Sequence, residues 1–135
     1  MRKKTILSTI KLSKEQCDLF LNNDIELLQY NFIKITPLSF ELPSHNGSWI
    51  FTSKNAVDAV YSSNEKLKCV KMPHYCVGEK TKLALVKNGQ KVIKMSNNSL
   101  KLANFLTKNY KNEKYVFCRG SIINKDFSDF FYRNK

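Results

Sequence analysis

The 135-residue sequence has few cysteines, and their arrangement excludes two common uses of the residue. They form no C-x-x-C pair and have no histidine at ligand spacing, so neither a zinc site nor a disulfide framework is expected. The four are Cys17, Cys69, Cys76 and Cys118. Cys76 and Cys118 lie within apolar runs, which predicts small buried thiols.

Long apolar runs are also missing. No segment reaches the length of a membrane span, and Ser8, Thr9 and Lys11 interrupt the apolar start too early for a signal peptide. We therefore expect a cytoplasmic protein with no membrane partner.

Acidic residues and arginines are scarce. The chain has 11 acids against 23 bases, a net charge of +12, and residues 66–119 hold thirteen of the bases and two of the acids. An anionic partner would explain this excess, but a composition biased toward lysine and asparagine would produce it without any ligand. With only Arg2, Arg119 and Arg133, bidentate readout of nucleic-acid bases is disfavoured.

Familiar catalytic motifs are absent as well. The sequence has no G-x-x-x-x-G-K-[ST] loop, no G-x-G-x-x-G after its first strand and no G-x-S-x-G elbow. His45 and His74 are isolated histidines, and we interpret them as structural or solvated.

The N-terminal region reads as strand, helix, strand. Residues 5–10 are typical of a strand, Ser13 is a suitable helix N-cap, and residues 26–35 form a second extended run that ends at Pro37. Between them, Cys17, Phe20 and Leu21 share one helical face. These pieces can form a βαβ unit, and the proline-rich segment 37–48 is the best candidate for a boundary.

After this boundary, four strand-then-helix units follow one another. Strands are expected at 49–53, 75–78, 91–95 and 114–120, and helices at 55–61, 79–88 and 100–109. Gly89 should close the second helix and Ser99 should cap the third. Asn124 should cap a last helix with Phe127, Phe130 and Phe131 on one face. The pattern predicts an α/β fold with a parallel sheet flanked by helices on both faces.

Polar residues follow each of these strands. The turns read Thr52-Ser53-Lys54-Asn55, Gly78-Glu79-Lys80-Thr81, Ser96-Asn97-Asn98-Ser99 and Arg119-Gly120-Ser121. Ligands of open α/β sheets bind at the carboxyl ends of the strands, where helix N-termini favour anions. Each turn alone is an ordinary helix cap, but the four together favour a carboxylate or phosphate ligand.

The motifs "WIFTSKNAV", "CVGEKT", "NSLKLANFL" and "YVFCRG", in this order and at these spacings, resemble the uroporphyrinogen-III synthase family. That family shows an FTSxNAV turn, a VGxKT turn, a serine-led helix and a strand closing in RG. The resemblance covers most of residues 49–120.

The resemblance implies a cofactor-free lyase of haem and other tetrapyrrole biosynthesis. Hydroxymethylbilane would lose water and close, with inversion of its last pyrrole ring, to uroporphyrinogen III. Since this substrate is an anionic tetrapyrrole, the lysines and the strand ends would share one explanation, and positioning of the flexible chain would be the main catalytic device.

The resemblance also implies site residues and domains. Thr52, Ser53, Asn55, Gly78 and Thr81 match positions that face the substrate cleft in the family, and Ser99 and Arg119 match weaker ones; the catalytic residue stays unassigned. Family members have two flavodoxin-like lobes, so residues 1–36 would belong to an incomplete first lobe and residues 37–135 to the second. We expect a monomer.

Two departures from the family pattern leave alternatives open. Thr9 is followed by neither the arginine nor the proline of the family's first turn, and no residue matches the tyrosine of its returning strand. The chain could therefore be an inactive synthase fragment. A basic α/β nucleic-acid-binding module is the second alternative, and the scarcity of arginine weighs against it.

Overall fold

The computed structural model describes residues 4–44, 46–122, 127 and 129. It divides into two compact units, residues Met1–Pro37 and Leu38–Lys135. The sequence placed this boundary one residue earlier.

The first unit is a βαβ unit, in agreement with the sequence. Strand β1 (Lys4–Ser8) pairs in parallel with β2 (Ile25–Gln29), and α1 (Lys14–Leu21) connects them. Ser13 caps α1 through a capping box, in which its side chain accepts from the Gln16 N–H while the Gln16 side chain accepts from the Ser13 N–H. None of the described residues of this unit is buried.

The second extended run is shorter than the sequence predicted. Strand β2 ends at Gln29 rather than continuing toward Ile35, because its partner β1 ends at Ser8. Two further backbone bonds, from Tyr30 to Ser8 and from Phe32 to Thr9, close the pairing. Beyond them the described residues up to 44 have almost no regular structure.

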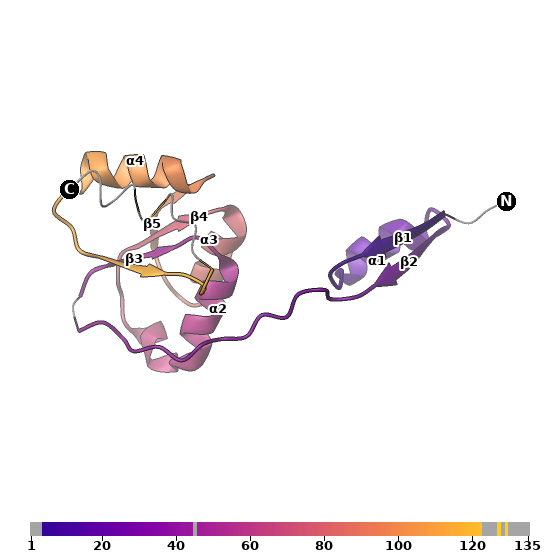
Figure 1. The fold of residues 1–135 in the computed structure, drawn as a ribbon, viewed down its shortest axis with the longest axis horizontal. Coiled ribbons are helices and arrows are strands. Elements are labelled where there is room, and N and C mark those ends of the chain that lie inside the picture. The colour runs from indigo at the N-terminus through magenta and orange to yellow at the C-terminus, as the bar shows by residue number, and fades with distance from the viewer. Residues whose placement is uncertain (1–3, 45, 123–126, 128, 130–135) are drawn as a thin grey trace. The chain divides into compact units, whose positions relative to one another are not determined.

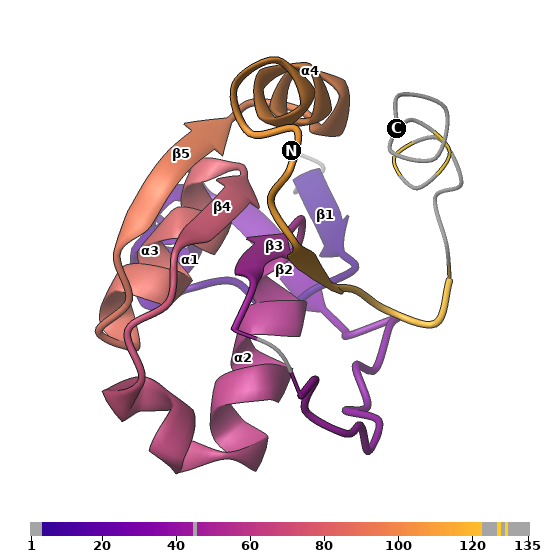
Figure 2. The same ribbon diagram turned by 90° about the vertical axis from the view of Figure 1, so that its left-hand side faces the viewer.

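The second unit is built on a four-stranded parallel sheet in the order β5-β4-β3-β6. Its strands are β3 (Ser48–Phe51), β4 (His74–Val77), β5 (Val92–Ser96) and β6 (Tyr115–Cys118). Figure 2 shows β5, β4 and β3 running in the same direction. This is the parallel α/β fold expected from the sequence, consistent with a flavodoxin-like arrangement.

Helices cover both faces of this sheet (Figure 1). The helices are α2 (Lys54–Ser63), the 3₁₀-helix η1 (Glu65–Cys69), α3 (Glu79–Lys87) and α4 (Ser99–Asn109). On one face α2 and α3 bury Val57 and Leu85 against Trp49, Phe51 and other residues. On the other face α4 buries Leu102 and Leu106 against Ile50 and Tyr75, so the sheet is the middle of three layers.

The ends of α3 and α4 test the predicted caps. Gly89 follows α3 with φ +74°, and the N–H groups of Gly89 and Gln90 return to Val86 and Leu85. This is a Schellman motif, so the prediction for Gly89 is confirmed. The prediction for Ser99 was wrong: Asn98 caps α4 by accepting from the Lys101 N–H at 2.9 Å, and Ser99 is the first helical residue.

Asn124, Phe130 and Phe131 of the predicted last helix lie outside the described residues. Phe127 is buried, and its ring centroid lies 4.9 Å from that of Phe117. In the part of the chain that the structure describes, no helix combines the length and the apolar character needed to cross a membrane.

Candidate active site

The strands of the second unit end together at one edge of their sheet. Phe51 pairs with Cys118 of β6 and with Cys76 of β4, while Val77 pairs with Ser96 of β5. Because all four strands are parallel, the turns that follow them lie side by side at this edge. The predicted residues found in these turns are Thr52, Ser53, Gly78 and Arg119, with Asn55, Thr81 and Ser99 in the first turns of the helices that follow.

The strand order creates a switch point between β3 and β6. The chain leaves β3 through α2 to reach β4 on one side, whereas β6 returns to the other side of β3. Thr52 and Arg119 directly follow the paired residues Phe51 and Cys118. In open α/β sheets the ligand crevice lies outside the carboxyl ends of the strands at such a point.

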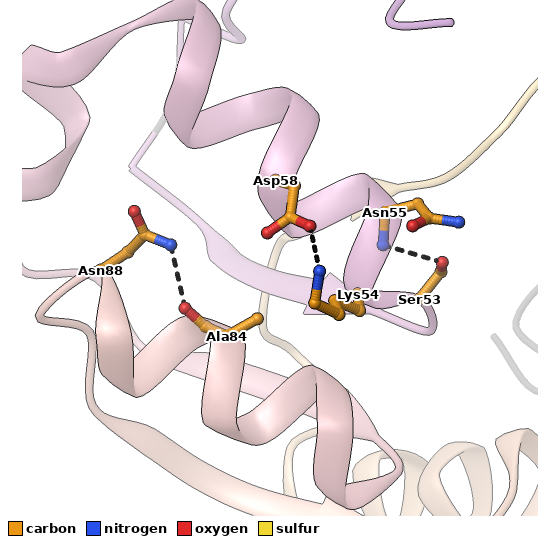
Figure 3. A network of polar contacts seen from close by, with 6 residues as sticks. All are labelled: Ser53, Lys54, Asn55, Asp58, Ala84 and Asn88. Carbon is orange, nitrogen blue, oxygen red and sulfur yellow. Dashed lines mark hydrogen bonds and ion pairs between the residues drawn. The ribbon is translucent and has the colours of Figure 1, made fainter. Parts of the chain in front are cut away.

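The turn after β3 supplies a helix cap, which explains why its apolar strand stops at two hydroxyls. The Ser53 hydroxyl accepts from the Asn55 N–H at 3.2 Å, and Lys54 pairs with Asp58 at 2.6 Å (Figure 3). Thr52 and Ser53 are partly exposed and the Asn55 side chain is exposed. The Ser53 hydroxyl is therefore held by the helix as an acceptor and keeps its own proton to donate to an anion.

The turn after β4 depends on Gly78. This residue has φ +85° and ψ 147°, a backbone conformation almost confined to glycine. Its N–H donates to the Ser96 carbonyl at 2.9 Å, which ties the ends of β4 and β5 together. No side chain of the described residues caps α3, so the first N–H groups of that helix are left to backbone, solvent or ligand.

One predicted residue lies less openly than the others. Thr81 is only 4% exposed, on the side of α3 that faces the core. Ser99 is partly exposed in the first turn of α4. Arg119 and Gly120, by contrast, are exposed immediately after β6.

Lys80 and Lys101 were not among the predicted site residues, yet both belong to this edge. Each is exposed and lies in the first turn of α3 or α4. Their positions two or three residues after a strand-to-helix turn were visible in the sequence. Together with Arg119 they give the edge a positive potential that adds to the helix dipoles.

Two thiols with raised pKa values lie in β4 and β6, beneath the edge. Burial raises the pKa of the Cys76 thiol to about 11 and that of the Cys118 thiol to about 12, so both are protonated at neutral pH and poor nucleophiles.

His74 is completely buried, and burial lowers its pKa. Its Nδ1 lies 2.7 Å from the Met72 carbonyl, which fixes the proton on that nitrogen, and its Nε2 accepts from the Tyr61 hydroxyl at 2.7 Å. This imidazole is a structural group of the core, as the sequence interpretation allowed.

Within the described ranges no cluster of histidine, cysteine and carboxylate side chains could hold a metal ion. The edge offers hydroxyls, amides, backbone N–H groups and cations, which suit the binding of carboxylates. Fold and site together define a parallel α/β protein whose strands end at an edge rich in hydroxyls, amides and cations.

A comparison with protein-family models narrows this class. The family described as uroporphyrinogen-III synthase HemD matches residues 18–135. The chain belongs to the uroporphyrinogen-III synthase family, as its motifs had suggested. No curated protein matched the chain in the sequence search.

Proposed function

We propose that this chain acts as a uroporphyrinogen-III synthase, binding hydroxymethylbilane at the carboxyl-end edge of β3, β4, β5 and β6. The observation that carries the proposal is the convergence of the family motif residues at the switch point, where Thr52 and Arg119 follow directly paired strand residues. Family membership supports the same reaction class.

In this proposal the protein works by positioning. Carboxylate side chains of the linear tetrapyrrole bind to the hydroxyls of Thr52 and Ser53, the amide of Asn55 and the guanidinium of Arg119. The N–H groups at the start of α3, which follow Gly78, hold a further carboxylate, and Ser99 contributes a hydroxyl near α4. Thr81, being buried, supports the turn from below.

The reaction needs little further chemistry from the protein. The hydroxyl of the substrate leaves as water, the chain closes on its last pyrrole, and that ring inverts before release. Unassisted closure gives the other isomer without inversion, so holding the two ends of the substrate in the inverting geometry is the catalytic contribution.

The isomer ratio tests this proposal. Freshly generated hydroxymethylbilane is supplied to the protein, the products are oxidised, and uroporphyrin III is quantified against uroporphyrin I. Predominant III is expected, whereas I alone, at the rate of buffer, contradicts the proposal and favours an inactive synthase fragment.

A pair of variants ties the activity to the proposed edge. Arg119→Gln removes a charged hydrogen bond worth about 1.5–3 kcal/mol, so kcat/KM should fall roughly tenfold or more. Lys108→Gln, in the last turn of α4, makes the same charge change away from the carboxyl ends of the strands and serves as the control. If kcat/KM falls equally in the two variants, the loss is due to net charge rather than to this edge.

A further inference from the structure

Just over half of the bases in residues 66–119 lie at the end of the sheet opposite the candidate active site. Of the thirteen bases in residues 66–119, seven belong to η1, to the end of α3 or to the segments that lead into β4, β5 and β6. We call them the amino-edge lysines: Lys66, Lys68, Lys71, Lys87, Lys91, Lys111 and Lys114. The anionic substrate at the other edge therefore does not explain them.

Hydrogen bonds between neighbouring segments hold the first five of these lysines in one region. Lys71 Nζ donates to the Gly89 carbonyl at 2.8 Å, which joins the segment before β4 to the segment before β5. Gln90 Nε2 donates to the carbonyls of Leu67 and Lys68 at 3.3 and 3.2 Å, which joins the same two segments again. Residues 66–71 and 87–91 thus form one surface.

The seventh, Lys114, extends this surface along the sheet, and Lys111 precedes it in the segment before β6. The Ser48 N–H donates to the Lys114 carbonyl at 2.9 Å, so Lys114 lies beside the start of β3. The order β5-β4-β3-β6 separates the starts of β5 and β6 by three strand spacings, roughly 14 Å at about 4.8 Å each. The amino-edge lysines form a row rather than a compact spot.

Acidic residues compensate little of this charge. Glu65 reaches Lys68 at 3.4 Å from a largely exposed position, and the Glu113 carboxylate accepts from the hydroxyls of Ser48 and Tyr75. Among the described residues, the other amino-edge lysines make no ion pair. The dipole of α3 favours Lys71 and Lys87 near its C-terminus and explains two of the seven.

We propose that the amino-edge lysines bind the phosphate backbone of a nucleic acid without reading its sequence. Lysine contacts phosphate as a point charge and needs no planar geometry, so the scarcity of arginine, which disfavours base readout, is no obstacle. A row of cations suits a linear polyanion. Protein interfaces need apolar, aromatic or arginine anchors, whereas segments 66–71 and 87–91 expose no apolar side chain except Cys69 and Val70.

The test is fluorescence anisotropy with a labelled 20-nucleotide oligothymidylate, titrated with the full chain between 50 and 200 mM salt. Binding should weaken linearly on a log–log plot. The variant Lys66→Gln/Lys91→Gln/Lys114→Gln should reduce the slope by about 2, since each lost phosphate contact on a single strand contributes roughly 0.7. These three side chains are exposed and make no hydrogen bond or ion pair with other residues that the structure describes. Equal thermal midpoints verify that the variant is folded.

The matched control is Lys34→Gln/Lys80→Gln/Lys101→Gln, which removes three exposed lysines elsewhere. An equal loss of slope in this control overturns the proposal, because net charge alone would then explain binding. Absence of oligonucleotide binding also overturns it, as does preferential binding to phosphatidylserine vesicles. The amino-edge variant should keep the wild-type isomer ratio, so this proposal and the synthase proposal can fail separately.

Discussion

The two units use the same strand-helix-strand pattern but differ in what they bury. In the second unit both faces of the sheet carry a core, and Phe51, Leu85, Leu102 and Leu106 are fully buried. In the first unit none of the described residues reaches that state, although its helix is better capped. The difference teaches that caps and strand pairing specify elements, while burial decides how firmly they are held.

The first unit has one covered face and one bare face. The helix α1 is linked to β2 by the Gln29 side chain, which donates to Cys17. Leu7 and Leu28 are paired on the two strands and are 57% and 52% exposed. Parallel sheets are normally covered on both faces, so we expect the second unit to carry the cooperative unfolding of the chain.

The largest predicted effect comes from comparing one leucine-to-alanine substitution in each unit. Leu85→Ala removes a fully buried side chain and should lower the free energy of unfolding by about 2–5 kcal/mol. Leu28→Ala, at an exposed position, should change it by less than about 0.5 kcal/mol. Urea unfolding at constant m-value measures both. If the two variants lose the same stability, Leu28 is buried in solution and the contrast between the units fails.

A smaller effect is expected at Gly78, where backbone conformation rather than packing sets the cost. Gly78→Ala meets no atom within 4 Å but forces a side chain into φ +85°, at a cost of roughly 1–3 kcal/mol. Gly120→Ala is the control, because that glycine also has open space and lacks a positive φ. Equal urea midpoints for the two variants would mean that the turn after β4 relaxes without strain.

The buried histidine makes the stability of the second unit depend on pH. Desolvation lowers the pKa of His74 in the folded state from its ordinary value of 6.5, while the Met72 carbonyl opposes the shift. The unfolded chain therefore takes up a proton that the folded chain does not. This contribution to stability is complete above about pH 6.5 and is lost as the pH falls through the folded pKa.

Urea unfolding at several pH values between 8 and 5 measures this loss. His74→Gln should flatten the profile, and His45→Gln measures the share of the other histidine. A wild-type profile that is flat across this window contradicts a lowered pKa for His74.

The structural features that were predicted correctly from the sequence are those that depend on residues close together in the chain. The Ser13 capping box, the glycine after α3 and the order of strands and helices follow from short-range patterns, and the structure confirms them. The 3₁₀-helix η1 was missed because five residues are too few for a periodic signal. Asn98 and Ser99 are both good caps, and the choice between them depends on which helix start turns Leu102 and Leu106 inward.

The residues of the candidate site could be predicted from the sequence, but the burial of each side chain could not. Strand ends that carry hydroxyls, glycine and arginine could be identified from the sequence, since parallel strands must end at one edge. The burial of Thr81 could not, because it depends on how α3 is rotated against the sheet. The charge of residues 66–119 is a clearer case. Its size could be counted from the sequence, but only the strand order shows that just over half of the bases lie opposite the candidate site.

The smallest predicted effect compares one cap from each unit. Ser13→Ala and Asn98→Ala each remove a side-chain acceptor at a helix N-terminus, worth about 1 kcal/mol. The helix α4 buries Leu102, Ala103 and Leu106, so Asn98→Ala should lower the global free energy of unfolding. The helix α1 buries no residue, so Ser13→Ala should instead speed hydrogen exchange of the α1 amides and leave global unfolding unchanged.

Hydrogen exchange resolved by residue measures the two variants together, with Ser13→Asp and Asn98→Asp as controls that restore a capping acceptor. If Ser13→Ala lowers the global free energy of unfolding as much as Asn98→Ala does, the first unit unfolds together with the second. The bare face of the first unit must then be covered in solution. If exchange rises only in α1, local capping without burial gives a helix that opens on its own, because no buried side chain links its opening to the rest of the chain.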